Sequence, residues 1–470
     1  MKTTPGTRTE KMLAGLVLLA AGLDVAIIGG GIGGGAAAYY TSLLRNQTGG
    51  SKDTIRVFET RDYLGGRLKH TYIEGNTIEL GGDAWSSANQ YVLELCTALG
   101  INTTTSTLSD PITANIGVWD GGAFLPLERL LAGNTLSELR AALAEGGFLR
   151  ALKQNYLLRG QGAGQGAAFR SVDAFLRPGS LDAWTTLNSS AYFGGRGIDV
   201  NVQTDFVEPL LRVIYDQGLS AHAFASLVAL TSAVGSGSVA AGNSELVEAL
   251  FARANAVVAL NTTVTTVRAL ADGGYFVETA LAGGGYRADK VVLACPIEFA
   301  DIHFDNITLP PMQAREFEHW YVTVVRAAAI DPAYFGLPPT ATVPENVLTK
   351  EGCASPFNVI QLEVALAQGD NLYKLFSNTD VQADLDQIFL GVSHVQVQHW
   401  PFTFPKLKPV AVPSAAGSAA ASGYQPIVLH DEGSGGGILY LNTMESVASA
   451  MEGSVIAGRN AAMLIAQSEI

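Results

Sequence analysis

Three glycines and one acid near the start of the chain have the spacing of a nucleotide-binding turn. Gly29, Gly31 and Gly34 form the pattern G-x-G-x-x-G directly after an apolar run at residues 25–28. In such a turn the first glycine permits the tight bend, the second lets a pyrophosphate approach the backbone, and the third lets the helix pack against the strand. Glu59 follows Gly34 by 25 residues, where a carboxylate can accept hydrogen bonds from a ribose. A dinucleotide is therefore the first expected ligand.

The surrounding chain must supply the strands and helices that position these residues. Residues 25–28 and 54–59 are predicted strands, and residues 36–44 a helix whose positive end faces the phosphates. Residues 90–99 have apolar side chains at helical spacing and end at Gly100, a predicted C-cap. Further on, residues 257–264 are predicted to form a strand along the adenine, and residues 290–296 a buried parallel strand.

The run at residues 59–67 is similar to the E-x-R-x-x-x-G-G-R pattern of flavin amine oxidases and their relatives. This resemblance implies FAD, with the acid at the adenosine ribose and the glycines and second arginine at the pyrophosphate. It also implies a glycine pair beside the isoalloxazine ring and a C-terminal helix, from residue 451, whose dipole stabilises charge on the flavin. Non-covalent binding is expected, because residues 445–452 contain no Cys or His. The expected cofactor contacts are Gly29, Gly31, Gly34, Glu59, Arg61, Gly65, Gly66, Arg67, Gly81, Gly82, Val264, Glu445, Met451 and Glu452.

Within these flavoproteins the chain most resembles the prenylcysteine oxidase family, also called prenylcysteine or farnesylcysteine lyases. The matching pieces lie at residues 208–217, 346–349, 404–409, 426–431 and 440–452. The family implies an α/β fold: a Rossmann-type GR2 FAD-binding domain with an inserted mixed α+β substrate domain. One departure follows Gly82, where the family tends to have S-x-x-H-P and this chain has residues 83–87, Asp-Ala-Trp-Ser-Ser. The insert between about residues 120 and 200 is also shorter and richer in glycine.

The resemblance implies cleavage of an S-prenylcysteine with O2 as oxidant. The prenyl C1 is allylic and carries sulfur, so hydride loss to flavin N5 leaves a delocalised cation. Water then adds, the hemithioacetal collapses to a prenyl aldehyde and free cysteine, and O2 reoxidises the flavin to give H2O2. The protein must supply an apolar tunnel and a polar grip on the amino acid. Arg212 is the candidate for the substrate carboxylate, with Tyr215 or Gln217 nearby.

Two other functions are compatible with the sequence. The altered residues 83–87 leave open a flavin oxidase of an amine or another lipophilic metabolite, including an oxidative cyclase. A non-catalytic carrier of prenyl chains on the same fold is the second alternative, and the intact set of flavin motifs argues against it. No metal-ligand spacing is present among the three cysteines, Cys96, Cys295 and Cys353.

Length and motif order predict a discontinuous domain arrangement for the 470 residues. Residues 23–110, 235–300 and 421–470 are assigned to the FAD-binding domain, and residues 111–234 and 301–420 to the substrate domain. Residues 1–22 have basic residues before a short apolar run, the pattern of a signal peptide. With sequons at Asn46, Asn102, Asn188, Asn261 and Asn306, this predicts a glycoprotein of the secretory pathway, in the lysosome or vacuole.

Charge and hydropathy restrict the partners. The net charge of −14 argues against nucleic acid, which requires concentrated positive charge. The apolar run near the N-terminus is too short for a membrane span, so no transmembrane segment is expected, although peripheral association with a membrane remains compatible with a prenylated substrate.

Overall fold

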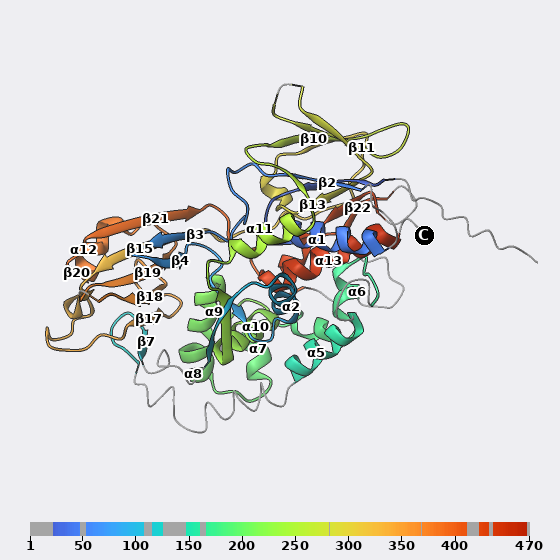
Figure 1. The fold of residues 1–470 in the computed structure, drawn as a ribbon. Coiled ribbons are helices and arrows are strands. Elements are labelled where there is room, and N and C mark those ends of the chain that lie inside the picture. Colours follow the sequence, from blue (N-terminus) through green and yellow to red (C-terminus); the bar gives the residue numbers. More distant parts are fainter. Residues whose placement is uncertain are drawn as a thin grey trace, which may run out of the picture.

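The computed structural model describes residues 22–47, 53–107, 115–125, 147–159, 166–281, 283–367, 369–410, 423–431 and 436–467. A parallel sheet with helices on one face forms one end of the molecule, and a second large sheet forms the other end (Figure 1). A group of helices lies below and between them. The predicted signal peptide lies outside the described residues, as does almost all of the glycine-rich stretch at 160–166.

The parallel sheet has a buried central strand because both of its faces are covered. Val25 and Ile27 of the central strand β1 pack with the helices, whereas Ala26 and Ile28 pack with a second sheet, as the alternation of a strand requires. Only the edge strand β22 runs antiparallel to its neighbour. In spatial order the strands are β22 (Val428–His430), β23 (Ile438–Tyr440), β13 (Lys290–Leu293), β1 (Asp24–Ile28), β2 (Thr54–Phe58) and β9 (Val257–Ala259).

Three helices cover one face of this sheet, and α1 and α13 lie side by side on it (Figure 1). Gly458 permits their close packing, because a Cβ there would lie 2.5 Å from the carbonyl oxygen of Gly33. The helices are α1 (Ile32–Gln47), α11 (Ser244–Arg253) and α13 (Met451–Gln467). The strand–turn–helix and the C-terminal helix predicted from the motifs are therefore confirmed.

The opposite face is covered by a four-stranded sheet, and here one prediction is wrong. Residues 257–264 do not form one strand, because the chain turns at Asn261 (φ 51°) between β9 in the parallel sheet and β10, which begins at Val264 in the other sheet. The last strand of this sheet, β14, pairs in parallel with β10. The strands in order are β12 (Gly285–Ala288), β11 (Tyr275–Thr279), β10 (Val264–Ala269) and β14 (His303–Asp305).

The second large sheet comes from the segments assigned to the substrate domain. Residues 321–330 do not form one continuous strand, because β16 (Ala329–Ile330) leaves the sheet and pairs with β20 (Phe389–Leu390). All neighbours are antiparallel except β17 and β7. In spatial order the strands are β21 (His394–Trp400), β15 (Trp320–Ala327), β19 (Asn371–Ser377), β18 (Val359–Ala365), β17 (Asn346–Thr349) and β7 (Ile116–Trp119).

Helices of residues 147–234 complete the substrate part. The helix α9 (Glu208–Tyr215) is preceded by a π-helical turn (Gln203–Val207), and it ends at Tyr215 because Asp216 takes the left-handed conformation (φ 53°). The other helices are α5 (Gly147–Arg159), α6 (Val172–Leu176), α7 (Ser189–Gly194), α8 (Val200–Val202) and α10 (Ala223–Val234).

Smaller elements connect the parts. Helix α2 ends at Gly100 (φ 67°), as predicted. The strand β8, at the predicted start of the second FAD segment, pairs with β5 and β6 in a separate sheet. No described helix is long and apolar enough to cross a membrane. These elements are β3 (His70–Ile73), β4 (Asn76–Glu79), β5 (Trp85–Ser86), α2 (Gln90–Leu99), β6 (Thr103–Thr107) and β8 (Gly235–Val239).

Candidate cofactor and active site

The first glycine turn has two glycines required by the protein itself and one that is not. A Cβ at Gly29 (φ 117°) would lie 2.6 Å from the carbonyl oxygen of Ala294, and one at Gly34 would lie 2.3 Å from the carbonyl oxygen of Gly29. At Gly31 the nearest heavy atoms are 3.8 Å away. The fold alone would therefore accept a side chain at Gly31, and the space it would occupy is left open for a ligand.

Glu59 is fixed next to this turn, because β1 and β2 are parallel neighbours and end at the same edge of the sheet. The N–H of Gly30 donates to Glu59 Oε2 at 2.7 Å, and the N–H of Arg61 donates to Oε1 at 2.9 Å. Each carboxylate oxygen keeps a free lone pair for a further donor. Glu59 is therefore oriented beside the glycine turn, and its contact with a ribose stays a prediction.

The second glycine turn lies directly on the first. The N–H of Gly65 donates to the carbonyl oxygen of Gly30 at 2.9 Å, and a Cβ at Gly66 (φ 63°) would lie 3.1 Å from Gly31 Cα. The guanidinium of Arg61 donates to the carbonyl oxygen of Gly66 at 3.2 Å. The structure therefore brings the two predicted phosphate-binding glycine runs together as one backbone surface.

Arg67 and Glu445 form an ion pair that joins the second turn to the C-terminal segment. Arg67 also donates to the carbonyl oxygen of Thr403, in the loop after β21. Glu445 Oε1 accepts a second hydrogen bond from Asn442 Nδ2 at 2.8 Å. The other oxygen, Oε2, is buried and has no hydrogen-bond partner among the described residues. It is an acceptor available to a bound group.

A network behind Glu445 was not foreseen from the sequence. Arg315 pairs with both oxygens of Glu298 at 2.7 and 3.0 Å and donates to the Tyr440 hydroxyl at 2.6 Å. It also donates to the carbonyl oxygen of Asn442 at 2.6 Å. Asn442 in turn contacts Glu445, so the position of that acid depends on Arg315. Of these residues, only Tyr440 and Asn442 lie in a piece of the sequence, residues 440–452, that matches the family.

The Gly81–Gly82 segment is packed against the protein's own backbone. A Cβ at Gly81 would lie 2.0 Å from the carbonyl oxygen of Arg67, and one at Gly82 would lie 2.6 Å from the Leu68 side chain. Trp400 Nε1 donates to the carbonyl oxygen of Leu80 at 2.6 Å. These contacts explain glycine here without a ligand, and the role of the segment beside the flavin ring stays a prediction.

Glu452 on the C-terminal helix α13 is a predicted cofactor contact, but its carboxylate hydrogen-bonds to the backbone of α2. Both oxygens of Glu452 accept backbone N–H groups at 2.9 Å, from Tyr91 and Val92 in the first turn of α2. Burial raises the pKa of Glu452 to about 7, against the lowering effect of these hydrogen bonds. Met451 is buried at the start of α13. The carboxylate of Glu452 thus acts as a cap of α2, and its role as a cofactor contact stays a prediction.

Val264 opens β10, in the sheet behind the parallel sheet, and is 3% exposed. The valine side chain has no hydrogen-bond donor and packs in the core between the two sheets. Only the backbone of Val264 could therefore form a hydrogen bond with the cofactor. The contact of Val264 with the adenosine stays a prediction.

The three residues predicted to grip the substrate all make contacts inside the protein. Arg212 Nη2 donates to Asn358 Oδ1 at 2.5 Å. Tyr215 is fully buried, and its hydroxyl has no hydrogen-bond partner among the described residues. Gln217 accepts from the N–H of Leu407 at 2.7 Å and holds the 404–409 segment against α9. Their contact with a substrate stays a prediction.

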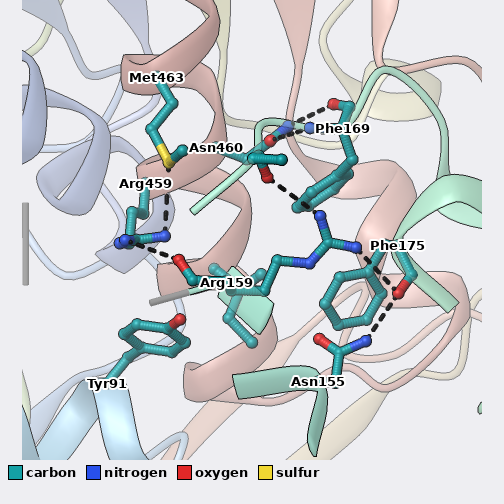
Figure 2. Close-up of a pocket in the computed structure, with 10 residues that line it drawn as sticks. Tyr91, Asn155, Arg159, Phe169, Phe175, Arg459, Asn460 and Met463 are labelled. Atoms are coloured by element: carbon teal, nitrogen blue, oxygen red, sulfur yellow. Dashed lines mark hydrogen bonds between the residues drawn. The ribbon is translucent and has the colours of Figure 1, made fainter. Parts of the chain in front are cut away.

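A closed cavity between α5 and α13 is too small for a substrate (Figure 2). Its volume is about 10 Å³, hardly that of one water molecule. Arg459 donates to the carbonyl oxygen of Arg159, and Arg159 donates to those of Ala174 and Phe175. Asn460 exchanges two hydrogen bonds with the backbone of Phe169. The cluster therefore joins the helices rather than forming an active site.

The residues present fit a dinucleotide cofactor. The open position at Gly31, the stacked glycine turns, the oriented Glu59 and the unpartnered oxygen of Glu445 lie along one edge of the parallel sheet. Ligands of open α/β sheets bind at this edge, beyond the carboxyl ends of the strands. The arrangement can bind a flavin dinucleotide with its phosphates at the N-terminus of α1.

The sequence is similar to those of known proteins. A family model described as prenylcysteine lyase matches residues 161–469, and one described as an NAD(P)-binding Rossmann-like domain matches residues 27–99. Farnesylcysteine lyase of Arabidopsis thaliana is 26% identical over 464 residues, covering 94% of this chain and 87% of that protein. Prenylcysteine oxidase 1 of Homo sapiens is 25% identical over 479 residues, with coverages of 94% and 88%.

Two solved structures have the same fold. Cyclohexylamine oxidase from Brevibacterium oxydans superposes with a TM-score of 0.62 at 17% identity, covering 95% of this chain and 99% of that chain. A triple mutant of putrescine oxidase superposes with a TM-score of 0.59 at 16% identity, with coverages of 94% and 98%. The predicted fold class, a Rossmann-type domain with an inserted substrate domain, is therefore confirmed.

Proposed function

The chain belongs to the prenylcysteine lyase family, and on that basis we propose that it is an FAD-dependent oxidoreductase that cleaves the thioether of S-prenylcysteine. The observation that carries the cofactor assignment is the pair of stacked glycine turns, in which a Cβ at Gly31 would meet no protein atom closer than 3.8 Å while Glu59 is held beside the turn. Bound FAD supplies the two-electron acceptor for oxidation of the prenyl carbon next to sulfur. Water and O2 complete the reaction as its other reactants.

The protein's own residues have three tasks in this reaction. Backbone N–H groups at the N-terminus of α1 bind the pyrophosphate, next to the glycine turn. The Arg67–Glu445 pair orients the middle of the cofactor site and keeps water from the carboxylate, which is 4% exposed. Arg212, at the junction of α9 with the substrate sheet, is the candidate for the carboxylate of the amino acid.

The decisive experiment is anaerobic mixing of the purified protein with farnesylcysteine while the flavin absorbance at about 450 nm is followed. We expect bleaching, then recovery on exposure to air with release of H2O2 and farnesal. Bleaching by a panel of amines and not by farnesylcysteine would instead support the amine oxidase alternative. A colourless protein that binds farnesylcysteine without flavin would support the carrier.

The source of the substrate suggests the compartment in which the enzyme works. S-prenylcysteine is released by proteolysis of prenylated proteins, so we propose a role in their catabolism in the lysosome or vacuole, reached by the secretory pathway. The N-terminal pattern at 1–22 and the five sequons support this proposal. Asn102, Asn261 and Asn306 are exposed and are sterically available to a glycan. Peptide-N-glycosidase treatment of the protein from a eukaryotic host tests it, and an unchanged mass would contradict it.

A further inference from the structure

A fully buried lysine lies where the cofactor part meets the substrate sheet. Lys374 on β19 is 0% exposed, and its Nζ lies 3.1 Å from Asp83 Oδ2 and 2.9 Å from Glu363 Oε1. Lysine is almost never fully buried unless its charge is paired. Glu363 comes from the neighbouring strand β18, but Asp83 comes from the segment that follows Gly81 and Gly82.

That segment is held by hydrogen bonds on its other sides as well. The N–H of Gly82 donates to the carbonyl oxygen of Arg67 at 2.9 Å. Asn243 Nδ2 donates to the carbonyl oxygens of Gly82 and Asp83 at 2.9 and 2.7 Å, and the Asn243 N–H donates to Glu79 Oε1 at 2.6 Å. These contacts fix the segment to the cofactor part. The Asp83–Lys374 ion pair fixes it to the substrate sheet.

The charges around Lys374 make it the centre of this junction. Burial raises the pKa of Glu79 to about 8, with a further contribution from the charge of Asp83. Burial also raises the pKa of Glu363, and Lys374 opposes that shift. Burial lowers the pKa of Lys374, but the charges of Asp83 and Glu363 outweigh it and hold the pKa above its usual value. Lys374 is therefore the positive charge that these three carboxyl groups surround.

We propose that Lys374 is a positioning residue of the oxidase, whose ion pair with Asp83 sets the position of the Gly81–Gly82 segment and thereby orients the flavin toward the substrate sheet. The proposal deepens the proposed function and rests on it, because it takes this segment as a wall of the flavin site.

The test compares Asp83→Asn, Asp83→Ser, Lys374→Met and the double variant D83N/K374M with the wild type. Lys408→Met is the matched control. Lys408 pairs with Glu316 at 2.9 Å, the distance of the Lys374–Glu363 pair, but both side chains are more than half exposed (64% and 63%). The readouts are FAD content, flavin circular dichroism and reduction potential, and the rate of anaerobic bleaching by farnesylcysteine.

We expect the Asp83 and Lys374 variants to keep FAD, to change the flavin circular dichroism, and to bleach roughly 10- to 100-fold more slowly, as a displaced reacting centre does. The double variant should lose less than the product of the two single effects, since both act through one contact. Lys408→Met should behave as the wild type.

The proposal is overturned if both Asp83 variants match the wild type in circular dichroism, potential and rate, or if the two single effects multiply in the double variant. Should Lys374→Met fail to fold, the Asp83 variants decide alone, because that side chain is 36% exposed and leaves the Lys374–Glu363 pair intact. A wild-type flavin that farnesylcysteine does not bleach refutes the proposed function, while circular dichroism and potential still test Lys374. A wild type without FAD refutes both.

Discussion

Arg67 and Glu445 are 378 residues apart in sequence and form an ion pair in which the acid is far more buried than the base. The Glu445 side chain is 4% exposed and that of Arg67 is 26% exposed. Water can thus hydrate Arg67 when its partner is lost, whereas Glu445 without Arg67 would be a buried charge. The two ends of the pair should not contribute equally to stability.

Loss of the arginine should therefore cost more than loss of the acid's charge. Arg67→Met leaves the Glu445 carboxylate with Asn442 as its remaining hydrogen-bond donor, which should lower the free energy of unfolding by about 3 kcal/mol. Glu445→Gln should lower it by about 1 kcal/mol. Urea unfolding of the FAD-free proteins measures both, and the double variant should be more stable than Arg67→Met alone. Equal losses in the two single variants would contradict this reading.

Substitutions at two glycines of the first turn should separate an effect on FAD binding from an effect on stability. Gly31→Val should fold with nearly unchanged stability but bind no FAD, because its side chain would occupy the space left for the pyrophosphate. Gly34→Ala should destabilise the apoprotein, since its Cβ would lie 2.3 Å from the carbonyl oxygen of Gly29. Thermal unfolding without FAD and a flavin titration measure the two effects. FAD binding by Gly31→Val with normal affinity would exclude this turn as the phosphate site.

The contribution of two buried glutamates to stability should fall as the pH rises from about 4.5 to 7. Burial raises the pKa of Glu452 to about 7. In that pH range the folded protein therefore binds more protons than the unfolded chain, whose glutamates titrate near 4.3, and the free energy of unfolding decreases with pH. This group contributes a loss on the order of 3–4 kcal/mol that is complete above its folded pKa. Burial raises the pKa of Glu79 to about 8, so its contribution to stability is lost in the same way up to about pH 8.

Urea unfolding of the apoprotein at pH 5 and pH 8 measures this dependence. Glu452→Gln should reduce the difference between the two pH values, although it also weakens the cap of α2, because its amide nitrogen cannot accept a backbone N–H. An unchanged difference in Glu452→Gln would assign the pH dependence to other groups.

His222 should act in the opposite direction at lower pH. It is fully buried, its Nδ1 accepts the N–H of Ala225 at 3.2 Å, and its Nε2 lies 3.2 Å from the carbonyl oxygen of Ser446. The ring is therefore neutral, with the proton on Nε2. Burial lowers its pKa to about 4, so the unfolded chain binds a proton first and the contribution of His222 to stability decreases as the pH falls from 6.5 toward 4.

His222→Asn is the variant that tests this effect. Asparagine keeps an acceptor for the first turn of α10 but does not titrate. As the pH falls from 6.5 to 4, the free energy of unfolding of the variant should increase relative to that of the wild type, because only the wild type loses the contribution of His222, as measured by urea unfolding of both proteins. An identical slope would show that His222 does not control stability in this range.

Local sequence determined the elements that bind the cofactor. The strand, glycine turn and helix around Gly29–Gly34, the acid at the end of β2, and the C-terminal helix are each encoded within a few residues, by periodicity and by backbone freedom at glycine. Their predicted order along the chain and the fold class therefore agree with the structure. The helix predicted at 90–99 and its cap at Gly100 agree for the same reason.

Only the tertiary structure decided which distant side chains meet. Sheet order brings Arg67 to Glu445, the docking of α13 on α2 directs Glu452 to backbone N–H groups, and the junction of the two parts pairs Asp83 with Lys374. The tertiary structure also decided which residues belong to which strand, because the turn at Asn261 divides residues 257–264 between β9 and β10. Hydrophobic periodicity reports which face of an element is buried, but it does not specify the element that covers that face, so partners of buried charges can be read only from the packed structure.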